Sequence, residues 1–171
     1  MQESDKDLKH WYCIFTKPRQ ADVVAQKLTL LPEIEVFTPK LKRNKVRKGR
    51  YTEVIEELFP SYIFSRFSLE RYAHMIRYTR GVRRLVGDTE GYPITVDERI
   101  IQTIQERIKD GFVVMTSPDL KTGDSVRVTD GPFAGLAGIF LKELKPRDRI
   151  MILLNAIHYQ ARVQVAPYQV E

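Results

Sequence analysis

Runs of apolar and aromatic residues, several of them alternating with polar ones, predict strands in the first part of the chain. The stretches with this pattern are residues 11–16, 36–42, 51–58, 62–67 and 82–86. The second and third flank a basic segment, and Gly49 lies where a hairpin between them would turn. We therefore expect a long β-hairpin and an antiparallel sheet.

Three further stretches repeat apolar residues every three or four positions, which predicts helices. They are residues 19–31, 69–78 and 98–108. Pro32 would end the first helix, and Ser68 fits the N-cap of the second. Thr95 and Glu98 fit a capping box before the third, which Gly111 would stop. This order of elements predicts an α+β domain whose antiparallel sheet is flanked by helices.

A second, smaller domain is expected after a linker. The predicted division is an N-terminal domain over residues 1–110, a linker over 111–122 and a C-terminal domain over 123–171. The C-terminal domain has two interpretations. In the first, residues 133–144 form a helix with one apolar stripe, which Pro146 would end. In the second, the alternation of apolar and polar residues around Val163 and Val165 favours strands in a small β unit. Both structures stay open from the pattern alone.

Charge is distributed unevenly along the 171 residues. The formal net charge is +6, and residues 40–50 (KLKRNKVRKGR) hold seven basic residues and no acidic one. A second basic group consists of Arg77, Arg80, Arg83 and Arg84. The basic segment is either a solvated hairpin tip or an arm that faces the phosphates of a polyanion and adds salt-dependent affinity.

Signs of catalysis or of a membrane span are missing from the sequence. Apolar runs are far shorter than the roughly 20 residues that a membrane helix needs. Cys13 is the single cysteine, so no internal disulfide forms, and we expect it to be a small buried residue. His10, His74 and His158 fall in separate elements, and no catalytic motif is present. We expect a soluble protein of a reducing compartment that is not an enzyme and holds neither metal nor cofactor.

Several motifs resemble those of the NusG/RfaH family of transcription elongation factors. Residues 11–12 (WY) with the helix after them, residues 58–64 (LFPSYIF) and residues 79–82 (TRGV) are similar to the family's N-terminal domain. Residues 123–144 (GDSVRVTDGPFAGLAGIFLKEL) are similar to a KOW motif. The basic segment and residues 149–157 (RIMILLNAI) are most similar to the RfaH-type transcription antiterminator.

The resemblance implies a cytoplasmic, monomeric bacterial factor that suppresses pausing and termination at specific operons. It would bind the clamp helices of the RNA polymerase β′ subunit, the gate loop of the β subunit and the non-template DNA strand. The positions matching the polymerase-binding patch are Phe15, Leu58, Phe59, Pro60 and Tyr62. The positions matching DNA-binding residues are Lys17, Gln20, Lys27, Thr79, Arg80, Arg83 and Arg84. At the gate-loop contact, where RfaH has His and Thr, this chain has residues 72–75 (YAHM).

Two states of the C-terminal domain are implied as well. In NusG it is a five-stranded β-barrel that binds the termination factor Rho or the ribosomal protein NusE. In RfaH it is an α-helical hairpin that covers the polymerase-binding patch, and Glu56 and Arg149 match an interdomain ion pair of that closed state. The alternative functions are a general NusG-like elongation factor and a KOW-type RNA-binding or ribosome-associated module.

Overall fold

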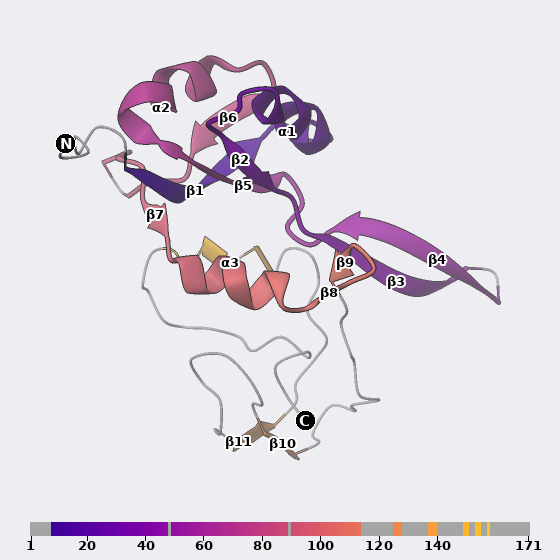
Figure 1. The fold of residues 1–171 in the computed structure, drawn as a ribbon. Helices are drawn as coiled ribbons and strands as arrows, with labels where there is room; N and C mark the ends of the chain where they lie inside the picture. Colours follow the sequence, from indigo (N-terminus) through magenta and orange to yellow (C-terminus); the bar gives the residue numbers. More distant parts are fainter. Residues whose placement is uncertain are drawn as a thin grey trace. The chain divides into compact units, whose positions relative to one another are not determined.

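The computed structural model describes residues 8–47, 49–88 and 90–113 and, towards the C-terminus, residues 125–127, 137–139, 149–150, 153–154 and 157 (Figure 1). The chain forms two compact units. Unit 1 holds residues 1–39 and 59–102, and unit 2 holds residues 40–58 and 103–171. Residues 40–58 therefore leave unit 1 in mid-sequence and associate with residues from the end of the chain.

Unit 1 is built on one antiparallel sheet. Its strands are β1 (Lys9–Thr16), β2 (Glu35–Phe37), β5 (Tyr62–Ser68), β6 (Val82–Leu85) and β7 (Thr95–Val96). The order across the sheet is β2-β5-β1-β6, and β7 pairs with β1 as well. In the register of β1 and β5, Ile14 lies opposite Ile63 and Phe15 lies opposite Tyr62. Because side chains alternate along a strand, these two pairs face opposite sides of the sheet.

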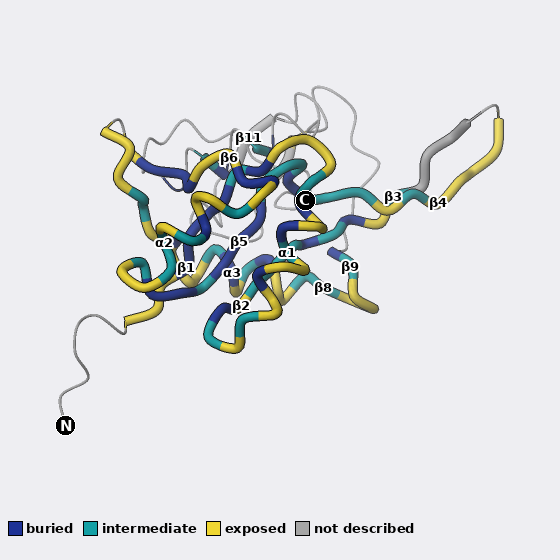
Figure 2. Tube along the Cα trace, turned by 90° about the horizontal axis from the view of Figure 1, so that it is seen from above, coloured by how far each residue is buried: buried dark blue, intermediate teal, exposed yellow. Residues whose placement is uncertain are grey.

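Two helices cover one of those sides (Figure 1). They are α1 (Ala21–Thr29) and α2 (Leu69–Tyr78). Val24 and Leu28 of α1, one turn apart, and Ile76 of α2 are buried in the same core as Ile14 and Phe67 of the sheet. Full burial of such a side chain contributes about 1.5–3 kcal/mol, so this layer holds both helices on the sheet. Figure 2 shows β1 and β5 buried over most of their length.

Unit 2 contains a long β-hairpin. Its main sheet has the order β4-β3-β9-β8, formed by β3 (Lys40–Arg47), β4 (Arg50–Glu57), β8 (Ile108–Lys109) and β9 (Phe112–Val113). A separate pair joins β10 (Ser125–Arg127) to β11 (Ala137–Ile139). The hairpin turns after Arg47, where Gly49 has a φ of 72°. Glycine enters this left-handed region without steric cost, so the predicted turn residue is confirmed.

The predicted strand over residues 36–42 is in fact two strands in different units. β2 ends at Phe37 and β3 begins at Lys40. Pro39 lies between them and has no N–H to donate to a strand ladder, which accounts for the break. Most of the basic segment that begins at Lys40 is strand β3.

The third helix, α3 (Glu98–Gln105), is shorter than predicted. The predicted capping box is wrong, because Asp97 Oδ1 accepts a hydrogen bond from the backbone N of Arg99 at 2.9 Å while Thr95 belongs to β7. Ile108, expected in the helical stripe, lies in β8. Gly111, expected as the helix stop, lies between β8 and β9 with a φ of 82°. The spacing of apolar residues located this helix but not its ends.

The remaining strands and helices predicted for the N-terminal part are confirmed, and with them the α+β class. Towards the C-terminus, residues 137–139 are strand rather than helix, whereas residues 149–150, 153–154 and 157 are helical. The rest of the predicted helical stripe, residues 114–122 of the predicted linker, Val163 and Val165 lie outside the described residues. The predicted domain boundaries stay predictions. Within the described ranges, no helix has the length and apolar character to cross a membrane.

Candidate functional site

The face of the unit 1 sheet opposite α1 and α2 is aromatic. Phe15 stacks on Tyr62 with ring centroids 4.8 Å apart and planes inclined by 23°. Phe59 lies edge-on to Phe64, with centroids 5.9 Å apart and an angle of 87°. Both are favoured arrangements of aromatic pairs. Alternation along β1 produces this face, since Phe15 follows Ile14, which points into the helical core.

A strained turn fixes the backbone next to these rings. Ser61 has a φ of 68°, which is uncommon for a residue with a side chain. Its carbonyl oxygen accepts two hydrogen bonds from Thr16, one from the backbone N at 2.8 Å and one from Oγ1 at 3.1 Å. Thr16 is fully buried at the end of β1. These two bonds hold the turn against β1, beside Phe15.

The five residues predicted to bind polymerase differ in exposure. Phe15, Pro60 and Tyr62 are half-buried. Leu58 and Phe59 are only 1% and 7% exposed. Leu58 and Phe59 therefore present little of their side chains at the surface of this structure.

The predicted DNA-binding residues gather where β1 leads into α1 and α2 leads into β6. The backbone N of Lys17 donates to the carbonyl of Gly81 at 2.8 Å, and Lys27 Nζ donates to the carbonyl of Arg80 at 3.3 Å. Gly81 has a φ of 105°, and a Cβ there would lie 2.8 Å from Val24 Cγ2. Only glycine lets this loop approach α1 so closely.

Other residues of the same set complete the cluster. The side chain of Gln20 lies 3.3–3.4 Å from where a Cβ on Gly81 would stand. Thr79 Oγ1 donates to the carbonyl of Met75 at 2.9 Å, just past the end of α2. Arg83 and Arg84 follow on β6 with exposed side chains. All seven predicted DNA-binding residues thus lie in one region of unit 1.

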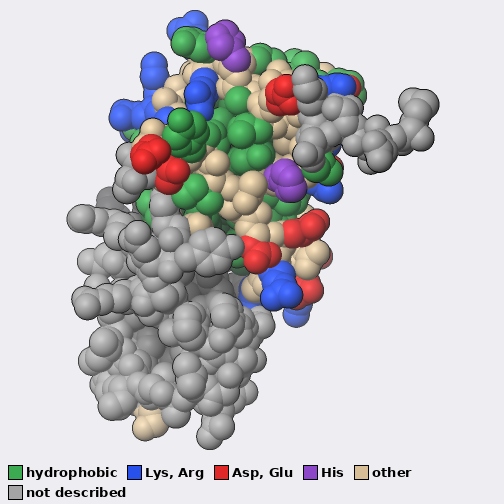
Figure 3. Space-filling view, turned by 90° about the vertical axis from the view of Figure 1, so that its left-hand side faces the viewer, with side chains coloured by type: hydrophobic (Ala, Val, Ile, Leu, Met, Phe, Trp, Pro, Cys, Tyr) green, Lys and Arg blue, Asp and Glu red, His purple; other side chains and the backbone are tan. Residues whose placement is uncertain are grey.

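The two predicted sets meet at the ring of Phe15. The guanidinium carbons of Arg83 and Arg84 lie 5.5 and 6.0 Å from its centroid. Cation–π contacts of this length attract by about 0.5–1 kcal/mol at exposed sites. Burial raises the pKa of the Tyr62 phenol, and the charge of nearby Arg84 partly opposes that shift. On the face drawn in Figure 3, hydrophobic and basic side chains likewise adjoin one another.

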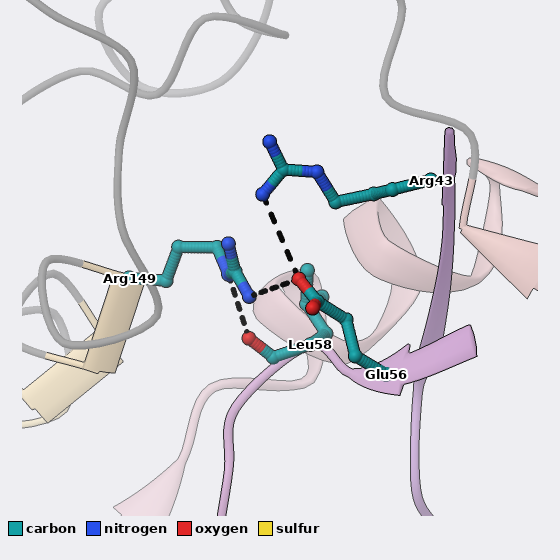
Figure 4. A network of polar contacts seen from close by, with 4 residues as sticks. All are labelled: Arg43, Glu56, Leu58 and Arg149. Atoms are coloured by element: carbon teal, nitrogen blue, oxygen red, sulfur yellow. Dashed lines mark hydrogen bonds and ion pairs between the residues drawn. The ribbon is translucent and has the colours of Figure 1, made fainter. Parts of the chain in front are cut away.

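A second polar cluster lies in unit 2 around Arg149 (Figure 4). The side chain of Arg149 is almost fully buried; its Nε donates to the carbonyl of Leu58 at 2.8 Å, and its Nη2 donates to Glu56 Oε1 at 3.3 Å. Arg43 Nη1 lies 3.6 Å from the same carboxylate oxygen. The expected pairing of Glu56 with Arg149 is therefore present, between two residues of unit 2.

Two participants in this cluster were not predicted from the sequence: Arg43 and the carbonyl of Leu58. The hairpin register places Leu41 opposite Glu56, so Arg43, two positions further along β3, lies on the same face as Glu56. Strand alternation could have indicated Arg43. No sequence signal points to a backbone carbonyl as the partner of an arginine 91 positions away.

The positions matching the gate-loop contact lie on α2. Tyr72 donates to Glu33 Oε2 at 2.9 Å, and this hydrogen bond raises the pKa of its phenol. Ala73 and Met75 pack against the core of unit 1. His74 is exposed, and its ring centroid lies 4.6 Å from that of Tyr78. Of these four positions, His74 presents its side chain most openly.

Cys13 and the histidines are the remaining side chains that the sequence singled out. No three His, Cys, Asp or Glu side chains among them are grouped to hold a metal ion. Cys13 is fully buried, as predicted, and burial raises the pKa of its thiol. His158 lies outside the described residues. The site residues are instead stacked aromatic rings at Phe15 and Tyr62, exposed basic side chains on β6, and the buried ion pair of Arg149 with Glu56.

Comparison with known proteins identifies the family. A family model described as transcription termination factor nusG matches residues 9–105, more than half of the chain. The chain belongs to the NusG family. The family's members are transcription factors, so the resemblance seen in the sequence is confirmed at this level.

Relatives of this NusG-family chain cover nearly its whole length. It is 27% identical over 181 residues to the transcription termination/antitermination protein NusG of Deinococcus radiodurans, covering 91% of this chain and 94% of that protein. It is 26% identical over 184 residues to the protein of the same name from Yersinia pestis, covering 100% and 99%. A solved structure described as domain interaction in Thermotoga maritima NusG is 22% identical with a TM-score of 0.46, covering 82% and 83%.

Proposed function

We propose that this chain is an RfaH-like member of the NusG family that suppresses RNA polymerase pausing and termination at specific operons. In this proposal Phe15, Leu58, Phe59, Pro60 and Tyr62 bind the β′ clamp helices. The positions around His74 face the β-subunit gate loop, and the cluster from Lys17 to Arg84 binds the non-template DNA strand.

The contact of Arg83 and Arg84 with Phe15 supports this division of roles. Half-buried rings suit an apolar protein partner, and exposed guanidinium groups suit phosphates and stacked bases. One factor could therefore contact polymerase and the exposed DNA strand at the same time. A bound factor that favours the elongating conformation shifts the polymerase away from its paused states without any chemistry.

The observation that carries the RfaH-like form of the proposal is the hydrogen bond from Arg149 to the carbonyl of Leu58. Leu58 and Phe59 are buried, and Arg149 contacts the chain immediately before Phe59. A C-terminal segment held there would keep Leu58, one residue of the polymerase-binding patch, covered. Release of that segment would then be the step that recruitment to DNA triggers.

A second candidate is a general NusG-like elongation factor. The antiparallel pairing of Ser125–Arg127 with Ala137–Ile139 favours it, because strands there suit a permanent β-barrel. In that case the C-terminal domain would be free to bind the ribosomal protein NusE. The two candidates differ in whether the contacts of Arg149 restrain polymerase binding.

Binding to a stalled RNA polymerase elongation complex of arbitrary DNA sequence separates the candidates. The full chain would be compared with Arg149→Ala, which removes the hydrogen bonds to Leu58 and Glu56. Hydrogen bonds to a charged group contribute about 1.5–3 kcal/mol, and 1.4 kcal/mol is a factor of ten, so we expect at least about tenfold tighter binding by the variant.

The matched control is Glu53→Gln, which breaks the exposed 2.9 Å pair of Lys42 and Glu53 in the same hairpin. It should bind as the unchanged chain does. Equal, tight binding by all three proteins would favour the general factor. Absence of binding by all three would contradict the polymerase-binding function itself.

A further inference from the structure

An exposed pair of rings lies at the end of α2. Tyr78 is the last residue of the helix and is 78% exposed, and His74, one turn before it, is exposed as well. Their ring centroids lie 4.6 Å apart, with the planes inclined by 41°. Side chains four positions apart are neighbours on the surface of a helix, so the two rings form one aromatic surface.

The helix end that carries these rings is anchored. Ile76, between the two ring residues in sequence, is fully buried in the core of unit 1. Thr79, the first residue after the helix, donates from its backbone N to the carbonyl of Ile76 at 3.1 Å and from Oγ1 to the carbonyl of Met75 at 2.9 Å. Because the backbone at Tyr78 is fixed before any ligand arrives, stacking on its ring costs less conformational entropy.

The surroundings of the ring pair are basic. Residues 71–84 hold five arginines and no acidic residue. Arg77, three positions after His74, and Arg80, two positions after Tyr78, both have exposed side chains. Tyr78 also directly precedes Thr79 and Arg80, which belong to the proposed DNA-binding cluster. This charge and this continuity favour a polyanion with flat apolar faces over an apolar protein surface.

Nucleic acids combine phosphates with flat bases, but the form of the nucleic acid matters. In a duplex, stacked neighbours cover the faces of each base. In a single strand, a base is free to stack on an aromatic side chain, and proteins that bind single strands combine such rings with positive charge. A single strand is thus the ligand that this end of α2 fits best.

We propose that Tyr78, supported by His74, is a stacking platform for one base of single-stranded DNA, with Arg77 and Arg80 available to its phosphates. This inference rests on the proposed function, in which the chain binds an exposed non-template strand. It adds a base contact outside the seven DNA-binding positions that the family resemblance supplied. The platform accepts any base, because every base has a π face.

Stacking and ion pairing differ in their dependence on salt. Each ion pair with a phosphate of a single strand contributes about 0.7 to the slope of log affinity against log salt, because it releases a counterion. Stacking of a base on a neutral ring releases none. Loss of the Tyr78 ring should therefore weaken binding and leave the slope unchanged, whereas Arg80→Gln should reduce the slope by about 0.7.

The experiment measures fluorescence anisotropy of a short labelled single strand of DNA with the full chain, between about 50 and 200 mM salt. Tyr78→Ala should weaken binding at least about fivefold, the lower end of what one stacked base contributes. Tyr78→Phe keeps the ring and should retain most of the affinity. The matched control is Tyr92→Ala, which removes another tyrosine, 68% exposed, from the loop between β6 and β7. It should bind as the unsubstituted chain does.

A second strand of the same length, abasic throughout, keeps the phosphates but has no base to stack. The unsubstituted chain and Tyr78→Ala should bind this abasic strand equally. Circular dichroism shows whether Tyr78→Ala folds. Should it not fold, Tyr78→Leu takes its place, since leucine keeps apolar bulk without a ring and should cause the same loss.

Equal affinity of Tyr78→Ala and the unsubstituted chain for the normal strand would overturn the inference and leave the proposed function standing. An equal loss on the abasic strand or on duplex DNA would also overturn it, as would a larger loss on single-stranded RNA of the same sequence. If the unsubstituted chain does not bind single-stranded DNA, the DNA-binding part of the proposed function fails and this inference fails with it.

Discussion

The guanidinium carbon of Arg83 lies 5.5 Å from the centroid of the Phe15 ring. Phe15 is near the end of β1, Arg83 is on β6, and the two strands pair antiparallel. Tyr62 stacks on the same ring at 4.8 Å. The ring of Phe15 therefore contacts Tyr62, which we propose binds a protein partner, and Arg83, which we propose binds DNA. A change at Phe15 should affect both kinds of binding.

Phe15→Leu and Arg83→Gln should be coupled in their effects on stability. Leucine keeps apolar contact but has no ring face for the guanidinium group. A double-mutant cycle in urea should therefore give a coupling free energy of about 0.5–1 kcal/mol. Combining Phe15→Leu with Arg77→Gln, on the exposed side of α2, should be additive. Additivity in both cycles would mean that the contact contributes nothing in solution.

Gly81→Ala should destabilise the fold more than Gly91→Ala. Both glycines have positive φ, 105° and 87°, so alanine pays a backbone cost of roughly 1–2 kcal/mol at either. At Gly81 the new Cβ would also lie 2.8 Å from Val24, whereas at Gly91 it would meet nothing within 4 Å. Overpacking adds about 1–3 kcal/mol at Gly81. Chemical denaturation measures both, and equal losses would argue against the close approach of this loop to α1.

Glu56→Gln should destabilise the chain more than Glu53→Gln. The carboxylate of Glu56 lies near the guanidinium groups of Arg149 and Arg43, and Arg149 is only 2% exposed. Loss of a charged hydrogen-bond partner predicts about 1.5–3 kcal/mol. The pair of Lys42 and Glu53 is exposed, so its loss predicts about 0–1 kcal/mol. Urea unfolding of both variants gives the comparison, and a smaller loss at Glu56 would refute the importance of the buried pair.

The thiol of Cys13 should be unreactive in the folded protein. Burial raises its pKa, so the neutral thiol is the form that the fold stabilises. That contribution is complete below the unfolded pKa of about 8.5 and is lost as pH rises above it. Alkylation in native buffer should be slow from about pH 7 to 8, and urea should accelerate it greatly. Rapid, stoichiometric modification without urea would contradict the burial of Cys13.

The spacing of apolar and polar residues predicted most of the strands and helices of unit 1. Each of these elements follows from the spacing of apolar residues within a short segment. Examples are the aromatic run of β1, the helical spacing of Val24 and Leu28 in α1, and the strand that begins at Tyr62. Such elements can be predicted without knowledge of their distant contacts. The residues of the candidate site came from the family resemblance, and the structure brings the predicted DNA-binding positions together because β1 and β6 pair and Gly81 closes on α1.

Long-range relationships could not be read from the sequence. The break at Pro39 separates two strands that the pattern joined, and residues 40–58 associate with residues more than 40 positions later. The contact of Arg83 with Phe15 depends on strand register, and the burial of Phe59 depends on tertiary packing. Residues 133–144 form one apolar stripe as a helix, yet residues 137–139 are strand, so contacts beyond the local pattern decide the structure there.

In the proposed function, the surface around Phe15 acts on RNA polymerase during elongation. This is tested by the half-life of a polymerase paused at a defined position, with and without the Arg149→Ala chain, which lacks the proposed restraint. We expect this variant to shorten the pause, and we expect the added change Phe15→Ala to abolish the effect. An unchanged or longer pause, with the Arg149→Ala chain bound to the complex, would contradict it.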